Sequence, residues 1–352
     1  VWASDAERKA RKNRTFATLE GLELKWNRNL DGTYVANYYA NQMFRAMGVY
    51  AQNTSLANVN FGGYNYGVYT MYELVDEIFL NRYFGESEAS GDLYKCAWGL
   101  LNAGTGGGWS GATYLKNTLN SASPEVLGKS FIYELKTNKK KSTNAALKNL
   151  VNTLDSGSTV DKETFAKVVN PENWVKFVAA SYFVGNPDDI RNNYNNHYVY
   201  FLSNGQAVFI PYDNDRCFGL TTSKKDMSSF SPYAEDTALQ GTQSSKLYKY
   251  SVTSRTNNYT AEYTQALKDV ANSGWLDYSK YKEYYQIAKT HFANVAIPDS
   301  NIKLYVSNMN ESPVTYKNSQ LAFSESTGLS SNMNVSTYFT KIMERYNTAM
   351  NK

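Results

Sequence analysis

Cysteine and histidine are scarce in this chain. Its 352 residues include only two cysteines, Cys96 and Cys217, and two histidines, His197 and His291. Two cysteines are too few for a disulfide-stabilised scaffold or a cysteine-rich metal site. Two histidines likewise argue against a histidine-based zinc centre. The sequence therefore argues against metal centres built on sulfur or imidazole ligands.

Long apolar runs and nucleic-acid motifs are also absent. No apolar run reaches the roughly 20 residues of a membrane span, and none near Val1 resembles a signal segment. Because the chain does not begin with Met, we expect it to be a processed part of a longer protein. The net charge is +4, and the one basic run, 136–141, is typical of a solvated loop or helix face. No zinc-finger spacing, RNP-type aromatic signature or basic helix predicts a nucleic-acid partner.

Two common motifs, one for phosphate and one for calcium, lack required residues. Residues 128–130 read Gly-Lys-Ser, but a phosphate loop also needs a glycine where Ser123 stands. An EF-hand loop beginning at Asp213 needs glycine at its sixth position and glutamate at its twelfth. Those positions hold Phe218 and Lys224. Both motifs are therefore rejected.

The length, composition and pattern of strand and helix segments predict an α+β fold. The length favours two lobes, and 42% apolar with 19% charged residues is ordinary for a globular protein. Alternating apolar residues and a Gly62-Gly63 turn indicate a hairpin, and Asp31 is a suitable cap for the helix that follows the first strand. In this half we expect strands at 20–26, 54–61, 64–74 and 91–95, and helices at 33–47 and 75–83.

The second half reads as mostly helical, with one hairpin. Ser142 and Asp161 are suitable N-caps, and Asn170 precedes a proline that opens an apolar helix ending at Gly185. Asn204-Gly205 is the strongest short hairpin signal in the chain. We expect the buried helix at 171–185, strands at 197–202 and 207–211, and further helices at 260–274, 277–295 and 336–352.

The residues with the strongest chemical signal lie between Gly185 and Gly219. The loop NPDDIRNNYNN leads into the hairpin, and PYDNDRCFG leaves it. A hairpin brings its two ends together. We therefore expect Asp188, Asp189 and either Asn193 or Asn196 to lie near Asp213 and Asp215.

These residue types suit phosphoryl transfer from ATP. One carboxylate orients or deprotonates the acceptor hydroxyl, while a second carboxylate and an asparagine oxygen hold Mg²⁺ or Mn²⁺ against the phosphates. The order acid, asparagine, hairpin, acid is also that of protein kinases. A turn in which the Asp213 and Asp215 side chains accept hydrogen bonds from backbone N–H groups remains an alternative for the second acidic pair.

The first half supplies cations and an acid that fit the same chemistry. Lys25 on the first strand and Glu73 at the end of the hairpin are predicted to form an ion pair that faces the ATP phosphates. Glu73 lies between Tyr72 and Leu74, so burial would require a partner for its charge. Lys95 is a second candidate cation.

Six segments between about residues 20 and 220 carry a resemblance: LELKW, FGGYNYGVYTMYELVDEIFLNRYFG, GDLYK, GNPDD, NNHYVYF and IPYDNDRCFG. Together, and in this order, they resemble the CotH kinase family, the spore-coat-protein-H-like atypical kinases. The C-terminal segment MERYN is also similar to the family. The chain departs from the family in having Tyr212 where the family usually has Trp, and in reading VANYYANQ where the helix after the first strand often has an arginine.

The resemblance implies a role for each candidate residue. Asp188 would be the catalytic acid/base, although spacing alone does not choose between it and Asp189. The metal ligands would be Asp213, Asp215 and Asn196, and the residues that bind the nucleotide would be Lys25, Glu73, Lys95 and Tyr212.

The resemblance also implies a fold, a location and a substrate. We expect a two-lobed atypical kinase-like fold, with a mixed β/α lobe at 1–115 and a mostly helical lobe at 116–352. The implied activity is ATP-dependent phosphorylation of Ser or Thr on extracellular or cell-surface proteins. A non-catalytic kinase-like module that binds glycans or proteins is the main alternative, and a magnesium-dependent transferase or phosphatase of another kind is a third interpretation. Cys96 and Cys217 flank these motifs, and whether they pair is left open.

Overall fold

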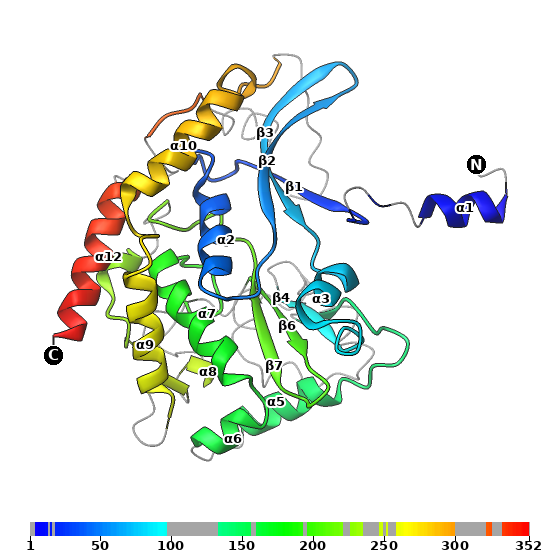
Figure 1. Ribbon diagram of the computed structural model, residues 1–352, viewed down its shortest axis with the longest axis vertical. Helices are drawn as coiled ribbons and strands as arrows, with labels where there is room; N and C mark the ends of the chain where they lie inside the picture. Colours follow the sequence, from blue (N-terminus) through cyan, green and yellow to red (C-terminus); the bar gives the residue numbers. More distant parts are fainter. Residues whose placement is uncertain are drawn as a thin grey trace, which may run out of the picture.

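The computed structural model describes most of the chain, with several gaps. Residues described are 4–12, 15, 18–96, 133–155, 160–192, 196–220, 226–234, 246–248, 251–252, 258–299, 322–325 and 333–351. They form two antiparallel sheets surrounded by helices (Figure 1). This confirms the predicted α+β class. Neither the predicted lobe boundary at 115 nor Asn193 falls within the described residues.

The smaller sheet is a long hairpin with one added strand. β2 (Thr54–Phe61) and β3 (Tyr64–Glu73) pair around the Gly62-Gly63 turn, as predicted, and β1 (Leu22–Trp26) pairs with the other edge of β3. In this register Lys25 lies opposite Thr70 and Leu22 lies opposite Glu73. Lys25 and Glu73 therefore sit three residues apart along the sheet. α2 (Ala36–Ala46) packs against β2.

The larger sheet has the strand order β5-β4-β6-β7. β6 and β7 are joined by the predicted Asn204-Gly205 turn, and every residue of both strands is buried. Alternate side chains pack on opposite faces, as the pleat requires: Tyr200 and Ile210 face one core cluster, and Val199 and Phe209 face the other. The strands are β4 (Leu93–Cys96), β5 (Glu134–Leu135), β6 (His197–Phe201) and β7 (Ala207–Pro211).

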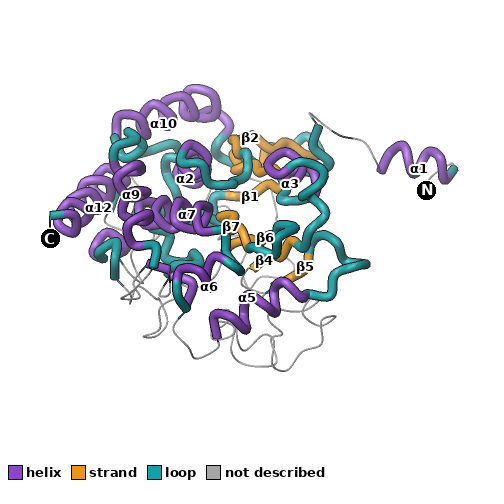
Figure 2. The backbone as a smooth tube through the Cα atoms, turned by 60° about the horizontal axis from the view of Figure 1, so that its bottom comes forward, coloured by secondary structure: helices purple, strands orange, loops and turns teal. Residues whose placement is uncertain are grey.

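The helices cover the two faces of this sheet unequally. α3 (Glu77–Phe84) packs in the smaller cluster on one side, while most of the remaining helices gather on the other, around α7 (Pro171–Val184) (Figures 1 and 2). The others are α1 (Asp5–Lys12), α5 (Ala145–Asp155), α6 (Lys162–Ala166), α8 (Lys246–Tyr248), α9 (Thr260–Ala271), α10 (Tyr278–Phe292) and α12 (Val335–Met350), with short 3₁₀ turns η2 (Met227–Ser229) and η4 (Ala293–Val295).

α7 is the central helix, and its ends follow from its sequence. The Asn170 side chain accepts the Asn173 N–H at 3.0 Å, and Pro171 occupies the first turn, as predicted. The helix ends at Gly185, whose φ of +58° suits a residue without a side chain. A Cβ there would lie 1.8 Å from the Tyr338 hydroxyl, so glycine also permits the close approach of α12.

Some predicted details differ from the structure. α2 begins at Ala36 rather than at 33, because the Asp31 carboxylate accepts the N–H groups of both Thr33 and Ala36 and so orders a separate turn before the helix. Cys96 and Cys217 are buried thiols and form no disulfide with each other, which answers the question that the sequence left open.

Among the residues that the structure describes, no helix has the length and apolar character of a membrane span.

Candidate functional site

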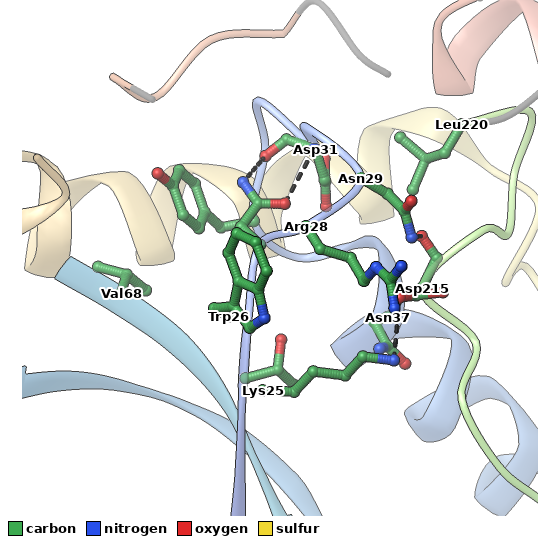
Figure 3. A pocket seen from close by; sticks show the side chains of 12 residues that line it. Lys25, Trp26, Arg28, Asn29, Asp31, Asn37, Val68, Asp215 and Leu220 are labelled. Atoms are coloured by element: carbon green, nitrogen blue, oxygen red, sulfur yellow. Dashed lines mark hydrogen bonds and ion pairs between the residues drawn. The ribbon is translucent and has the colours of Figure 1, made fainter. Parts of the chain in front are cut away.

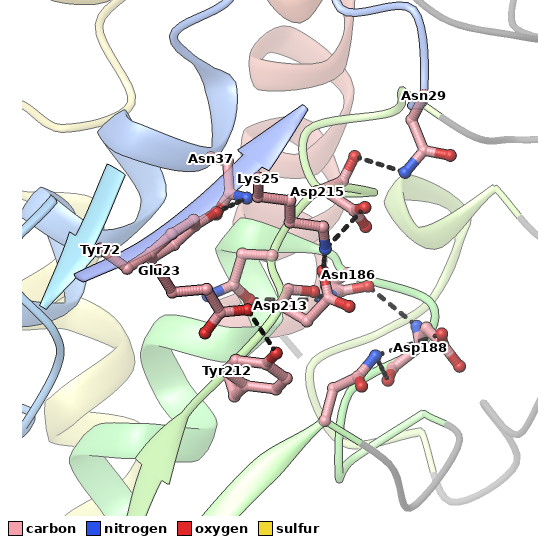
Figure 4. Close-up of polar contacts among 12 residues, drawn as sticks. Glu23, Lys25, Asn29, Asn37, Tyr72, Asn186, Asp188, Tyr212, Asp213 and Asp215 are labelled. Atoms are coloured by element: carbon pink, nitrogen blue, oxygen red, sulfur yellow. Dashed lines mark hydrogen bonds and ion pairs between the residues drawn. The ribbon is translucent and has the colours of Figure 1, made fainter. Parts of the chain in front are cut away.

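The centre of the site is an ammonium group between two carboxylates. Lys25 extends from β1 toward the loop that follows β7, where it contacts Asp213 and Asp215 (Figure 4). Its Nζ lies 2.9 Å from Oδ2 of Asp215. The three side chains are 17%, 25% and 16% exposed, so the cluster is partly open to a ligand. The structure thus joins the first strand to the predicted metal loop.

The charges of this cluster shift one another's pKa. Burial opposes ionisation of Asp213, but the Lys25 ammonium outweighs it and holds the pKa of Asp213 below its usual value. Burial, and then the charge of Asp213, raise the pKa of Asp215 to about 6 despite Lys25. The pKa of Lys25 itself is raised, because the two carboxylates overcome the effect of burial. Lys25 thus faces two carboxylates, and Arg28 and Arg216 add further positive charge nearby, since their charges also lower the pKa of Asp213 and Asp215 respectively.

The predicted metal loop, residues 212–220 after β7, has an unusual backbone. Asp213 and Phe218 have φ angles of +57° and +52°, a region that residues with a side chain seldom adopt. The loop is fixed against the end of α7, since the Phe218 N–H donates to the Val184 carbonyl at 2.9 Å. Side-chain amides support its backbone as well: Asn29 donates to the Asp215 carbonyl at 3.2 Å. Such outliers gather at functional sites, where the surrounding structure holds them in place.

The predicted catalytic loop lies beside this metal loop. The Asp188 side chain is 8% exposed, and the Asn196 amide donates to its Oδ2 at 3.2 Å and to its carbonyl oxygen at 3.0 Å. Asn196 itself has a φ of +52°. Its amide is therefore occupied by Asp188, and the structure places this predicted metal ligand against the predicted catalytic acid.

Asp189 has a different environment from Asp188. Its side chain is 4% exposed, and Oδ1 accepts the Asn192 N–H at 2.8 Å, which closes a local turn. Burial raises the pKa of Asp189 to about 7, although this hydrogen bond and the charge of Arg191 oppose the shift. These contacts give Asp189 a structural task and favour Asp188 as the catalytic group.

Replacing Asp189 by asparagine should change the pH dependence of stability. A carboxyl with a raised pKa in the folded state stabilises the fold below about pH 4, and this contribution is lost as pH rises toward 7. Asp189→Asn keeps an oxygen for the Asn192 N–H and has no charge to bury. We expect the variant to be more stable than the wild type at pH 8, by a few kcal/mol at most, and similar to it at pH 4. Guanidinium unfolding at both pH values measures this. A variant less stable at pH 8 would show that the ionised carboxylate balances Arg191 instead.

Tyr212 and Lys95 border the carboxylates on the side of the larger sheet. The Tyr212 hydroxyl donates to Oε1 of Glu23 at 2.9 Å, and the Lys95 Nζ lies 4.0 Å from the centre of the Tyr212 ring. The distance suits a cation–π interaction. Burial lowers the pKa of Lys95, although the charge of Glu23 opposes it. The predicted Tyr212 and Lys95 thus form one group next to Asp213.

The predicted ion pair between Lys25 and Glu73 is wrong. Glu73 is 2% exposed and forms its ion pair with Arg82 of α3, whose Nη2 lies 2.7 Å from Oε2. The Asn53 N–H and side-chain amide donate to the same oxygen at 3.0 and 3.1 Å. The sheet register explains the difference, because Glu73 lies opposite Leu22 and Lys25 lies opposite Thr70. Glu73 therefore links β3 to α3 and does not face the carboxylate cluster.

A small pocket opens on the other side of Lys25. Residues of the loop after β1 line it, together with Asp215 from the metal loop and Asn37 from α2 (Figure 3). The loop is ordered by Asn27 and Asp31, which exchange two hydrogen bonds of 2.9 and 3.0 Å. Its free volume is about 30 Å³, enough for a water molecule or two. A nucleotide would therefore have to widen this pocket or bind outside it.

The ligands at hand fit Mg²⁺ or Mn²⁺ rather than a metal that needs a complete protein cage. Within the described ranges, no three His, Cys, Asp or Glu side chains gather closely enough to hold a metal ion. Asp213 and Asp215 supply two carboxylates in one partly exposed cluster. Mg²⁺ commonly uses one or two carboxylates and completes its shell with water and phosphate oxygens. The donor set of the loop is consistent with that requirement.

Two residues were not anticipated from the sequence. Arg82 pairs with Glu73 away from the carboxylate cluster, and Asn186 links the predicted catalytic loop to the predicted metal loop. Arg82 follows Glu73 by nine residues and lies on the next helix. That spacing does not predict an ion pair unless the packing of the helix against the sheet is known. Asn186 lies between Gly185, which ends a helix, and Pro187, a position typical of an ordinary turn residue.

The arrangement of motif segments places the chain in a family. The family described as CotH kinase protein matches residues 4–312, which is most of the chain. The chain belongs to the CotH kinase family. This family suggests a kinase-like protein, in agreement with the carboxylate and lysine cluster. Comparison with curated proteins gave no match.

Proposed function

We propose that this protein transfers the γ-phosphoryl group of ATP to Ser or Thr hydroxyls of proteins outside the cell or at its surface, on a two-lobed kinase-like fold. The contact of Lys25 with Asp213 and Asp215 carries the proposal. It brings a lysine from the first sheet to two acids that follow the second hairpin, which is the set of groups that phosphoryl transfer requires. Membership in the CotH kinase family supports the same class of reaction.

Each residue has a task in this proposal. Asp213 and Asp215 would hold the divalent cation, which when bound would neutralise charge on the phosphate oxygens. Lys25 supplies a positive charge between these carboxylates, close to where the phosphates would lie. Lys95 and Tyr212 would line the nucleotide site on the side of the larger sheet. Asp188 would receive the proton of the attacking hydroxyl on a carboxylate oxygen.

ATP with Mn²⁺ or Mg²⁺ is expected to raise the melting temperature of the wild-type protein. A ligand present at 100 times its dissociation constant adds about 2.7 kcal/mol to the stability of the folded state. Asp213→Ala should abolish the shift, because the cation that joins the protein to the phosphates would lose a principal ligand. Asp269→Ala is the matched control, since Asp269 is an exposed carboxylate of α9 whose side chain accepts the Gln265 amide.

The outcomes separate the proposal from a binding module without catalysis. A metal-dependent shift in the wild type and in Asp269→Ala, lost in Asp213→Ala, would establish a nucleotide site. Transfer of labelled phosphate from ATP to Ser/Thr peptides would then establish the reaction. No shift with any nucleotide or metal would instead favour a module that binds glycans or proteins.

A further inference from the structure

One buried side chain joins the two loops that carry the acids. Oδ1 of Asn186 accepts the backbone N–H of Asp188 at 3.0 Å, and its Nδ2 donates to the backbone carbonyl of Asp213 at 3.0 Å. Asn186 is 0% exposed, and its own carbonyl accepts the Asn192 amide at 2.7 Å. A single amide thus binds the loop before the hairpin and the loop after it (Figure 4).

Both ends of this bridge are places where backbone geometry sets a functional side chain. Asp213 has a φ of +57°, which disfavours any residue with a Cβ, and the bond from Asn186 holds the carbonyl of that same residue. At the other end, the bond to the Asp188 N–H fixes where the chain turns after Gly185. Since the two acids sit on separate loops, their spacing depends on whatever links the loops.

We propose that Asn186 is a positioning residue that holds Asp188 and Asp213 at a fixed separation. The inference rests on the proposed function, because it assigns Asp188 to proton transfer and Asp213 to the metal. Asn186 touches neither substrate nor metal in this proposal and acts through the two backbones. An amide is the only uncharged side chain of this size that both accepts from one N–H and donates to one carbonyl in a fixed plane.

Asn173 offers an internal comparison. It is also a buried asparagine that bridges two elements: Oδ1 accepts the Phe209 N–H at 2.7 Å, and Nδ2 donates to the Phe209 carbonyl at 3.3 Å. It joins α7 to β7, away from the carboxylates. Its hydrogen bonds go to Asn170 and Phe209 and to neither acidic loop, so substitutions of Asn173 remove the same kind of bridge from the same core and are expected to leave the spacing of the two acids unchanged.

The first test replaces the bridging amide by a carboxyl of the same shape. Asn186→Asp still accepts the Asp188 N–H, but its ionised form cannot donate to the Asp213 carbonyl. We expect kcat at saturating Mn²⁺ to fall by about 10- to 100-fold, as for other groups that orient metal ligands.

Asn173→Asp is the control for lost stability. It should be destabilised to a comparable extent and keep wild-type kcat at a temperature where both variants are folded. An Asn186→Asp variant with kcat within twofold of the wild type overturns the proposal. So does an Asn173→Asp variant that loses as much kcat, since the effect would then follow from general loosening of the core.

A second measurement does not depend on phosphoryl transfer. The affinity for Mn²⁺ without nucleotide, followed by electron paramagnetic resonance, should be about 10-fold weaker in Asn186→Ala than in Asn173→Ala, because Asp213 loses its backbone support. Amide exchange at Asp188 should also be faster in Asn186→Ala alone. Equal Mn²⁺ affinities and equal exchange in the two variants overturn the role of Asn186.

These measurements distinguish the two levels of inference. A wild-type protein that binds Mn²⁺ but transfers no phosphate contradicts the proposed function, and the Mn²⁺ comparison still decides the role of Asn186. A wild-type protein that transfers phosphate while Asn186→Asp matches it contradicts only the role of Asn186. A protein that neither binds Mn²⁺ nor transfers phosphate overturns both.

Discussion

Asp188→Asn is expected to lower phosphoryl transfer by about 10²- to 10⁴-fold while ATP binding remains close to that of the wild type. The amide has the shape of the carboxylate but cannot accept the proton of an attacking hydroxyl, and general-base catalysis contributes about this factor. The oxygen of the new amide can still accept a hydrogen bond from the side-chain amide of Asn196, whose Nδ2 lies 3.2 Å from Oδ2 of Asp188 in the wild type. Single-turnover transfer and ATP titration, measured on the same preparation, check the two halves of this expectation.

The neighbouring acid provides the control for this experiment. Asp189→Asn should retain transfer, because Asp189 is buried and its carboxylate serves the turn at Asn192. If Asp189→Asn loses transfer while Asp188→Asn keeps it, the two roles are reversed. If neither variant changes the rate, the proton leaves by another route and the loop is not the catalytic loop.

Arg82→Met is expected to destabilise the protein by about 3 kcal/mol, near the lower end of the range for breaking a buried ion pair. The Glu73 side chain is 1% exposed and would keep its charge without its main partner, while Arg82 is 37% exposed, which moderates the loss. The guanidinium also lies 4.8 Å from the centre of the Tyr83 ring, a contact that methionine would retain only in part. Unfolding in guanidinium chloride measures the loss of stability.

Two further variants test the cause of that loss. Adding Glu73→Gln to Arg82→Met should recover part of the stability, because the buried charge is removed together with its partner. Lys162→Met breaks an exposed pair with Glu262, whose side chains are 35% and 43% exposed, and should cost less than about 1 kcal/mol. A loss in Arg82→Met as small as that in Lys162→Met would contradict the importance of the Glu73 pair.

Local sequence signals predicted the elements around the site. Asn204-Gly205 specified the β6–β7 hairpin, and Asn170-Pro171 with Gly185 specified both ends of α7. Those signals act within a few residues, because turn and cap conformations depend on local hydrogen bonds and on allowed φ values. Since a hairpin closes on itself, its two flanking loops were expected to meet, and Asn186 is seen to join them.

Local sequence signals could not predict contacts between residues that are far apart in the sequence. The pairing of Lys25 with Asp213 spans 188 residues, and nothing near Lys25 in the sequence distinguishes that partner from Glu73. The register of β1 on β3 decided the matter by placing Glu73 opposite Leu22, where α3 brings Arg82 within reach. Charge alone made both pairings reasonable, and only geometry separates them.

The sequence by itself determined the class of the fold, the two hairpins, the capped central helix and the family to which the chain belongs. Each of these depends on residue type and spacing over short stretches. The tertiary structure decided which charges neutralise one another and which amide links the two acidic loops. The physical reason is that the energy of an ion pair or a buried hydrogen bond depends on distance and burial, and both are fixed only when separate elements pack together.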